Sequence, residues 1–302
     1  IRRGTRCSTA KAFLRPVRLR RNLHTALNAH VTRILINPDN RQAYGVEFVR
    51  SNGRRQVVLA RKEVIVSAGS INSPQLLMLS GIGPRAQLSQ FGIPVLHDAP
   101  HVGANLQDHV GMGGLTFLVD QPISIVQDRF QAFPMTMQYV LHSKGPMTTL
   151  GGVEGLAFIH TKHNSSGVPD IQFHMAPASV NSDAGAKVRH VLGLTEHLYN
   201  TVYKPIANRD VYTLMPLLLR PRSRGWVRLR SANPFDAPLI NANYFADAHD
   251  MAVLLEGAKM ALRISRTAAM RRFGSALHTI ALPNCRHVPF GSDAYWECHI
   301  RT

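Results

Sequence analysis

Acidic residues are scarce in this chain. Its 302 residues include 18 Asp and Glu against 35 Lys and Arg, which gives a formal net charge of +17. Such an excess can serve a nucleic-acid or anionic-surface partner. However, neither basic concentration (residues 2–21 and 220–230) is interleaved with the aromatic residues that base stacking requires, and no zinc-finger spacing accompanies them. We therefore expect no nucleic-acid partner and favour a solvated basic face, with nucleic-acid binding kept as the weaker alternative.

Long apolar runs and cysteines are also few. No window reaches the roughly 18 apolar residues of a membrane span, so we expect none. The 45% hydrophobic content is enough for one large domain or two smaller ones.

Three cysteines are too few for a disulfide scaffold. Either Cys285 pairs with Cys298 across a turn-rich loop, leaving Cys7 free, or all three are separate thiols. A bridge would indicate an oxidising, extracellular setting, and otherwise the compartment is open.

Residues 62–84 are the stretch around which the chain is organised. Residues 64–66 (VIV) predict a buried strand, and the small residues 67–70 (SAGS) predict a bare turn. Ser73 then suits a helix N-cap and Pro74 the first helical position, with Gly81 beyond the helix end. A strand, bare turn and helix in this order can bring backbone N–H groups against a polar or anionic cofactor. An ordinary βα connection is the alternative from the residues alone.

The remaining pattern predicts two kinds of structure. Strands are expected at residues 27–36, 43–49 and 56–59, the last two forming a hairpin around Asn52-Gly53. After residue 110 the pattern becomes mostly strands with occasional helices, which favours a mainly antiparallel sheet flanked by helices. Further elements are predicted in this second part; the strands are 116–119, 151–159, 170–175, 211–218 and 225–229, and the helices are 130–141, 250–265 and 293–298.

Several of these segments resemble the glucose–methanol–choline (GMC) family of flavin oxidoreductases, in particular its FAD- and quinone-linked glucose dehydrogenase-like branch. Residues 67–83 (SAGSINSPQLLMLSGIG) are similar to the second signature of that family. Further similarities run on both sides of the signature; they are residues 4–14, 102–109 (VGANLQDH), 220–244, 250–265 and 295–301 (YWECHIR). The resemblance thus covers nearly the whole chain.

The resemblance implies an α/β plus α+β fold. A partial FAD-binding, Rossmann-like domain (residues 1–114) would be joined to a substrate-binding domain (residues 115–302). It implies FAD as the cofactor, bound near Val31, Ser67, Ala68, Gly69 and Asn105. It also implies oxidation of the CH-OH group of an alcohol or sugar by hydride transfer to flavin, an external electron acceptor, and no metal.

Two family features are missing from the sequence. No G-x-G-x-x-G/A motif opens a strand–helix unit. Residues 81–86 (GIGPRA) match that pattern, but a helical run and not a strand precedes them. No histidine lies in a His-x-x-Gly-Thr context, so no catalytic residue is assigned and the base is expected beyond Thr302. We therefore expect an internal fragment, inactive by itself. The alternative is a catalytically dead remnant that serves as a binding or structural module.

Overall fold

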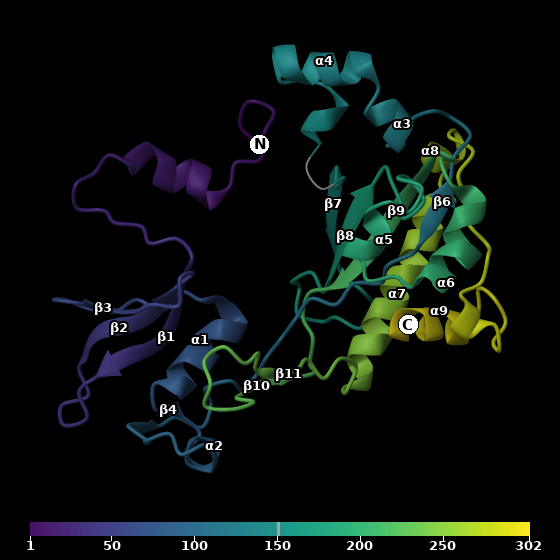
Figure 1. The fold of residues 1–302 in the computed structure, drawn as a ribbon. Helices are drawn as coiled ribbons and strands as arrows, with labels where there is room; N and C mark the ends of the chain where they lie inside the picture. The colour runs from purple at the N-terminus through teal and green to yellow at the C-terminus, as the bar shows by residue number, and fades with distance from the viewer. Residues whose placement is uncertain (150–151) are drawn as a thin grey trace. The chain divides into compact units, whose positions relative to one another are not determined.

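The computed structural model describes residues 1–149 and 152–302. The chain divides into two compact units, each made of segments distant in sequence (Figure 1). One unit contains Leu19–Asp108 and Ser223–Ala246, and we call it the signature unit. The other contains Ile1–Arg18, His109–Arg222 and Asp247–Thr302, and we call it the sheet unit. No helix in the described part of the chain is long and apolar enough to cross a membrane.

The signature unit contains a three-stranded antiparallel sheet in the order β1-β2-β3. Its strands are β1 (Ala29–Ile36), β2 (Ala43–Arg50) and β3 (Arg55–Leu59). The predicted hairpin is confirmed: β2 and β3 pair directly, and the turn between them contains Gly53 at a φ of +75°. Strand β3 is exposed along its whole length.

Two helices and two small pairs of strands complete the signature unit. The helices are α1 (Gly69–Leu79) and α2 (Arg85–Gln90). The pairs are parallel β4 (Ile82–Gly83) with β5 (His97–Asp98), and antiparallel β10 (Trp226–Arg228) with β11 (Leu239–Asn241). Met78, Leu88 and Leu229 form a buried cluster that joins α1, α2 and the β10 segment. Through Leu229, this apolar cluster packs the segment of residues 223–246 against the helices of the signature region.

The predicted strand at residues 64–66 is wrong. These residues lie in no strand, and Ile65 is 77% exposed. An apolar β-branched run becomes a buried strand only where neighbouring strands satisfy its backbone N–H and C=O groups. No described strand pairs with this segment.

The sheet unit is built on a five-stranded sheet in the order β12-β6-β9-β8-β7, antiparallel throughout. This agrees with the expected antiparallel sheet. Residue 151, the start of one predicted strand, lies outside the described residues, and the strand observed there is β7. The strands are β6 (Thr116–Leu118), β7 (Gly155–Ile159), β8 (Ile171–Ala176), β9 (Val211–Leu218) and β12 (Ala276–Leu277).

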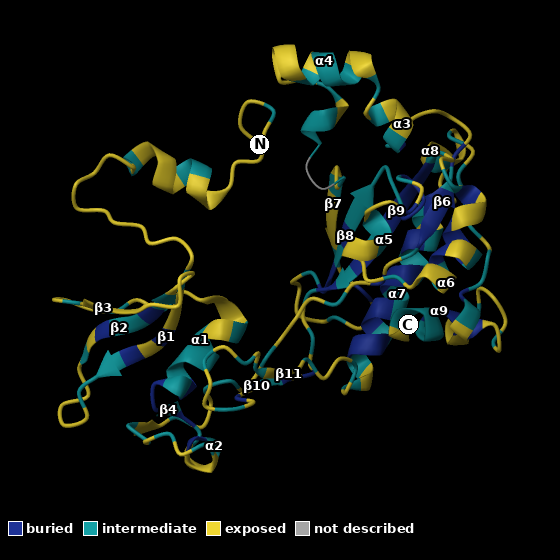
Figure 2. Ribbon diagram, viewed as in Figure 1, coloured by how far each residue is buried: buried dark blue, intermediate teal, exposed yellow. Residues whose placement is uncertain are grey.

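Helix α7 (Ala248–Ser265) covers one face of this sheet. A Cβ added at Gly257 would lie 3.0 Å from Pro216 Cβ and 3.2 Å from Ile171 Cδ1, so the helix backbone approaches the sheet closely at this glycine. Ile171 and Phe173 point to this face and are buried, and buried residues concentrate on β6, β9 and the inner side of α7 (Figure 2). The opposite face is free of α7.

The other helices of the sheet unit are shorter. They are α3 (Gln127–Phe130), α4 (Phe133–His142), α5 (Val188–Val191), α6 (Glu196–Leu198), α8 (Ala268–Arg271) and α9 (Asp293–Arg301), with π- and 3-10-helical turns at Ala10–Leu14, Arg15–Val17, Pro146–Thr148, Tyr199–Tyr203, Lys204–Ile206 and Pro283–Cys285. The predicted helices at 130–141, 250–265 and 293–298 therefore correspond to α4, α7 and α9, displaced by at most a few residues at their ends.

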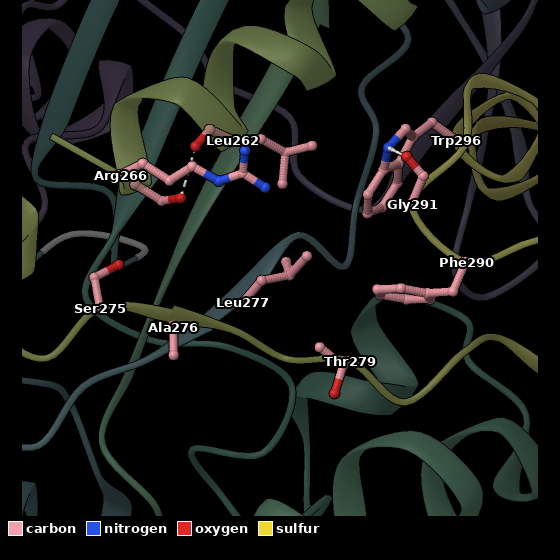
Figure 3. A pocket seen from close by; sticks show the side chains of 10 residues that line it. Leu262, Arg266, Ser275, Ala276, Leu277, Thr279, Phe290, Gly291 and Trp296 are labelled. Atoms are coloured by element: carbon pink, nitrogen blue, oxygen red, sulfur yellow. Dashed lines mark hydrogen bonds between the residues drawn. The ribbon is translucent and has the colours of Figure 1, made fainter.

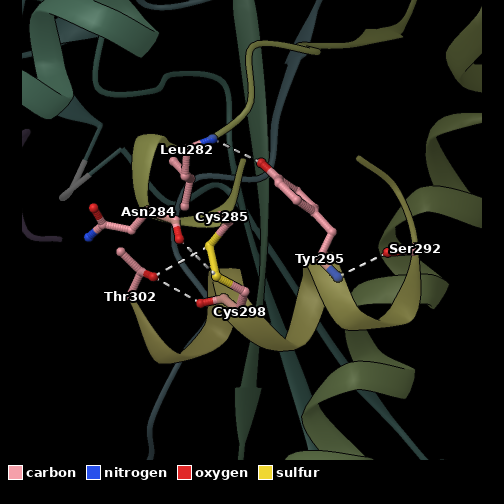
Figure 4. The surroundings of a disulfide bond; sticks show 7 residues. All are labelled: Leu282, Asn284, Cys285, Ser292, Tyr295, Cys298 and Thr302. Atoms are coloured by element: carbon pink, nitrogen blue, oxygen red, sulfur yellow. Dashed lines mark hydrogen bonds between the residues drawn. A yellow bond between two sulfur atoms is a disulfide. The ribbon is translucent and has the colours of Figure 1, made fainter. Parts of the chain in front are cut away.

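Of the two alternatives for the cysteines, the structure shows the bridge between Cys285 and Cys298 (Figure 4). Their Cα atoms are 5.8 Å apart, inside the range that a disulfide allows. The Ser292 hydroxyl accepts from Tyr295 N at 3.1 Å and begins α9, so the loop returns as the sequence predicts. Cys7 is free and exposed.

Candidate functional site

The turn of the signature lies at the start of α1. Ser67, Ala68 and Gly69 are all exposed, and Gly69 has a φ of +87°, in the region that favours glycine. The Ser73 hydroxyl accepts a hydrogen bond from Ala68 N at 3.0 Å. The expected helix start at Pro74 is therefore wrong: α1 begins at Gly69, and Pro74 lies inside it. With the turn at Gly69 and the hydrogen bond to the Ser73 hydroxyl, the helix begins more than one helical turn before the predicted start at Pro74.

Val31 lies on β1 and is 37% exposed. It pairs with Phe48 on β2, and the ladder register shifts immediately after it. Its neighbour His30 is stacked on Phe235, with ring centroids 5.1 Å apart. The backbone at Val31 is therefore held on one side by β2, while its side chain stays accessible.

Asn105 lies in an exposed loop with a φ of +57°. The loop is fastened to the β10 segment: Val227 N donates to Gly103 O at 2.6 Å, and Leu106 exchanges two backbone hydrogen bonds with Gly225. At the end of the loop the Tyr244 hydroxyl donates to the Asp108 carboxylate. That hydrogen bond raises the pKa of Tyr244 to about 12.

The structure thus places all five predicted cofactor residues in the signature unit, on exposed backbone or exposed side chains. Sequence reasoning missed the contacts that hold them. Ser80 Oγ accepts from Ile34 N at 2.9 Å and donates to Leu76 O at 2.7 Å, which ties the end of α1 to β1. Gln75 Nε2 donates to Asp236 O at 2.9 Å and ties α1 to the returning segment. A serine at the end of a helix and a glutamine inside it do not indicate in the sequence that they bond to residues as distant as Ile34 and Asp236.

The sheet unit contains a pocket of about 460 Å³ on the sheet face away from α7. His174 and Ala176 of β8, with Thr213 and Met215 of β9, form part of its wall. Each β8 residue stands directly opposite its β9 partner, so the four side chains share one face. The rest of the wall is mostly apolar and includes Ile125, Phe130, Val153, Val180, Val188 and Leu192. We call this cavity the sheet pocket.

Gly113 and Gly114 form another part of the sheet-pocket wall, and His299 holds them from behind. His299 Nε2 lies 2.9 Å from Gly113 O, and a Cβ on Gly114 would meet that same nitrogen at 2.9 Å. Nδ1 of the ring is buried without a hydrogen-bond partner. Burial lowers the pKa of His299 to about 4, so the ring is neutral and donates from Nε2. Sequence reasoning assigned His299 no role, and the ring acts through Gly113 at the wall of the pocket.

A second pocket of about 470 Å³ lies between the end of α7, β12 and the start of α9 (Figure 3). Its polar side chains mostly serve the fold: Trp296 Nε1 donates to Gly291 O at 3.1 Å, and Ser265 Oγ to Leu262 O at 2.8 Å. The hydroxyls of Ser275 and Tyr212 bond to one another at 2.6 Å. Neither an acid–base pair nor a nucleophile with a base lines it, so it is the weaker candidate for chemistry.

Comparison with known proteins identifies the family. Two family models described as GMC oxidoreductase match the chain, the N-terminal one over residues 1–111 and the C-terminal one over residues 221–302. The chain belongs to the GMC oxidoreductase family. The FAD-binding fold expected from the sequence is confirmed with it, and FAD is the cofactor of this family.

Relatives of the GMC family with known names match nearly the whole chain. Glucose dehydrogenase [FAD, quinone] of Drosophila melanogaster is 36% identical over 301 residues, 99% of this chain and 45% of that protein. Alcohol dehydrogenase [acceptor] of Pseudomonas putida is 34% identical over 275 residues, 89% of this chain and 45% of that protein. A formate oxidase structure from Aspergillus oryzae RIB40 matches all of this chain and 52% of its own, with 25% identity and a TM-score of 0.76. The chain spans about half the length of these relatives.

The described residues fit the part of FAD that the GMC resemblance assigns to them. A Cβ added at Gly69 would meet nothing within 4 Å, so the space beside this turn is open to a ligand. The α1 start presents backbone N–H groups, which favour the negative charge of a dinucleotide. Val31 offers an exposed apolar side chain beside its backbone. Residues 1–302 contain no strand–helix unit with the G-x-G-x-x-G loop for the pyrophosphate.

Proposed function

We propose that residues 1–302 supply part of the FAD site and the substrate-binding domain of an oxidoreductase that oxidises the CH-OH group of an alcohol or sugar. The observation that carries the proposal is the signature turn, Ser67 to Gly69. It is bare, exposed and open to a ligand, in a chain that both GMC family models match. The names of two relatives, a glucose and an alcohol dehydrogenase, support the reaction class.

Bound FAD supplies the hydride acceptor, and the chain supplies binding and orientation. Val31, Ser67, Ala68, Gly69 and Asn105 are the proposed cofactor contacts. Three side chains fix the backbone at these contacts: Ser73 at the turn, Ser80 between α1 and β1, and Tyr244 at the end of the Asn105 loop. Such support matters because a misplaced cofactor or substrate costs rate steeply.

The sheet pocket is the proposed substrate site. It is concave and mostly apolar with a few polar groups, as small-molecule sites usually are. The Gly113–Gly114 wall is fixed from behind by His299. An external acceptor, a quinone in the name of the Drosophila relative, would take up the electrons.

The test is a chimera in which residues 1–302 replace the matched part of the Drosophila melanogaster glucose dehydrogenase. We expect it to retain flavin, measured by absorbance, and to oxidise alcohols with a quinone acceptor. Ala68→Phe should abolish flavin retention because its ring would occupy the open space at the turn, whereas Ala232→Phe, at an exposed alanine of the same unit, should not. A folded chimera that lacks flavin, or an Ala68→Phe chimera with normal flavin, would overturn the proposal.

A further inference from the structure

The polar side chains of the sheet pocket are mostly engaged within the protein. Thr213 Oγ1 donates to Ala178 O at 2.7 Å. The hydroxyls of Ser179 and Thr116 bond to one another at 2.6 Å, and Ser182 Oγ accepts from Ser179 N at 2.9 Å. These hydroxyls stabilise the strands and the loop after β8, so they are poor partners for a ligand.

Asp183, the one carboxylate among the described residues of the wall, is also engaged. It accepts backbone hydrogen bonds from Gly185 at 3.0 Å, Lys187 at 2.6 Å and Val188 at 2.8 Å. These bonds fix the turn that leads into α5. Asp183 thus uses its acceptor capacity on its own loop, and a sugar hydroxyl would have to displace a backbone partner.

His174 is different. No hydrogen bond joins its ring to another described residue of the pocket wall. It stands between Leu156 of β7 and Met215 of β9, its direct neighbours in the ladder, and is half-buried. Between these two apolar neighbours, the imidazole offers one hydrogen-bond partner on the sheet face of the pocket. The wall also has the amide side chains of Gln127 and Gln131 and the ammonium group of Lys187. Gln131 and Lys187 are exposed and therefore solvated, and Gln127 is half-buried.

We infer that the substrate is an apolar alcohol, aliphatic or aromatic, whose hydroxyl is held by His174, and not a sugar; this inference rests on the proposed function. A sugar carries hydroxyls around its whole ring, and each one buried without a partner costs binding free energy. An apolar alcohol needs one partner for its hydroxyl, and its hydrocarbon part gains from burial against Phe130, Val180 and Met215. The wall therefore discriminates against the sugar named in the Drosophila relative.

The experiment measures binding to the 302-residue protein without flavin, by ligand-observed NMR titration with benzyl alcohol, toluene and glucose. We expect benzyl alcohol to bind at least about tenfold more tightly than glucose. His174→Leu should weaken benzyl alcohol by roughly two- to tenfold and leave toluene unchanged, since only the alcohol loses a hydrogen bond. His174→Gln, which keeps a polar partner, should restore part of the loss.

Ala176→Phe should fill the pocket and abolish binding of both aromatic ligands. Phe158→Ala, on β7 but outside the pocket wall, is the matched control and should bind as the wild type does. Because Ala176→Phe risks misfolding, His174→Leu carries the test independently. Glucose binding as tight as that of benzyl alcohol, absence of saturable benzyl alcohol binding, or equal effects of His174→Leu on alcohol and toluene would each overturn the inference. Flavin retention by the chimera would be unaffected by these results, so the two proposals fail separately.

Discussion

At the scale of single residues, Gly103 shows how a short contact fixes the Asn105 loop. Its φ is +82°, and a Cβ at this position would lie 2.2 Å from Val227 O. Both the conformation and the space demand glycine, because a side chain would push the loop off the β10 segment. The requirement comes from a residue more than a hundred positions away in sequence.

We expect Gly103→Ala to lower the free energy of unfolding by roughly 2–4 kcal/mol, from backbone strain together with the clash. Gly53→Ala is the matched control: its φ is +75°, but a Cβ there would meet nothing within 4 Å. It should cost only the strain of about 1–2 kcal/mol. Urea unfolding followed by circular dichroism measures both. Equal losses would mean that the approach of Val227 is unimportant.

His299 gives a prediction about pH. Its pKa is about 4 in the folded protein, against about 6.5 in an unfolded chain. As pH falls from 6.5 towards 4, the unfolded chain takes up a proton that the folded protein does not. The free energy of unfolding should therefore fall through this window, by on the order of 2–3 kcal/mol, and level off below it.

His299→Gln keeps a donor for Gly113 but cannot titrate, so it should flatten this part of the pH dependence. His97→Gln, at an exposed histidine of β5, is the control and should leave the slope unchanged. Chemical unfolding at several pH values from 7 to 4 measures the slope. A His299→Gln protein with the wild-type slope would show that another group titrates in this window.

At the scale of elements, the disulfide closes the loop between the 3-10 turn at Pro283–Cys285 and α9, across a sequence separation of 13 residues. Closing a loop of this size removes about 3 kcal/mol of unfolded-chain entropy in the loop model. Cys285→Ser together with Cys298→Ser should destabilise the sheet unit by about that amount. Cys7→Ser, at the exposed free cysteine, should not.

Thiol titration of the denatured protein checks the bridge directly. We expect one reactive thiol before reduction, that of Cys7, and three after it. Three thiols in the unreduced protein would contradict the disulfide. A bridge that persists in the isolated protein would support an oxidising compartment.

At the scale of the whole molecule, the two units carry different parts of the proposed reaction. The signature unit holds the predicted cofactor contacts, and the sheet unit holds the pocket. The domain boundary predicted at residues 114 and 115 stays a prediction. The compact units interleave along the chain, because residues 223–246 return to the signature unit through hydrogen bonds and the Met78 cluster.

We expect the 302-residue protein alone to show no alcohol oxidation above the buffer rate. The sequence contains neither a His-x-x-Gly-Thr base nor the pyrophosphate loop, and an alcohol is a poor hydride donor without a base. An acceptor-linked dye assay with added FAD and benzyl alcohol measures it. The Drosophila glucose dehydrogenase serves as the positive control. Turnover that depends on FAD would place a base within these residues.

The sequence by itself determined the family, the cofactor and most of the elements. Those inferences depend on local chemistry: the Asn52-Gly53 turn fixes its hairpin, and alternation and helical periodicity mark β8 and α7. The signature carries its small residues as a contiguous string. Tertiary structure alone decided that residues 64–66 form no strand, that α1 begins at Gly69, and that His299 holds Gly113. The first depends on the lack of a neighbouring strand, and the last on a partner distant in sequence. The start of α1 depends on the conformation of Gly69 and on the hydrogen bond from Ala68 N to the Ser73 hydroxyl, which the residue types alone do not specify.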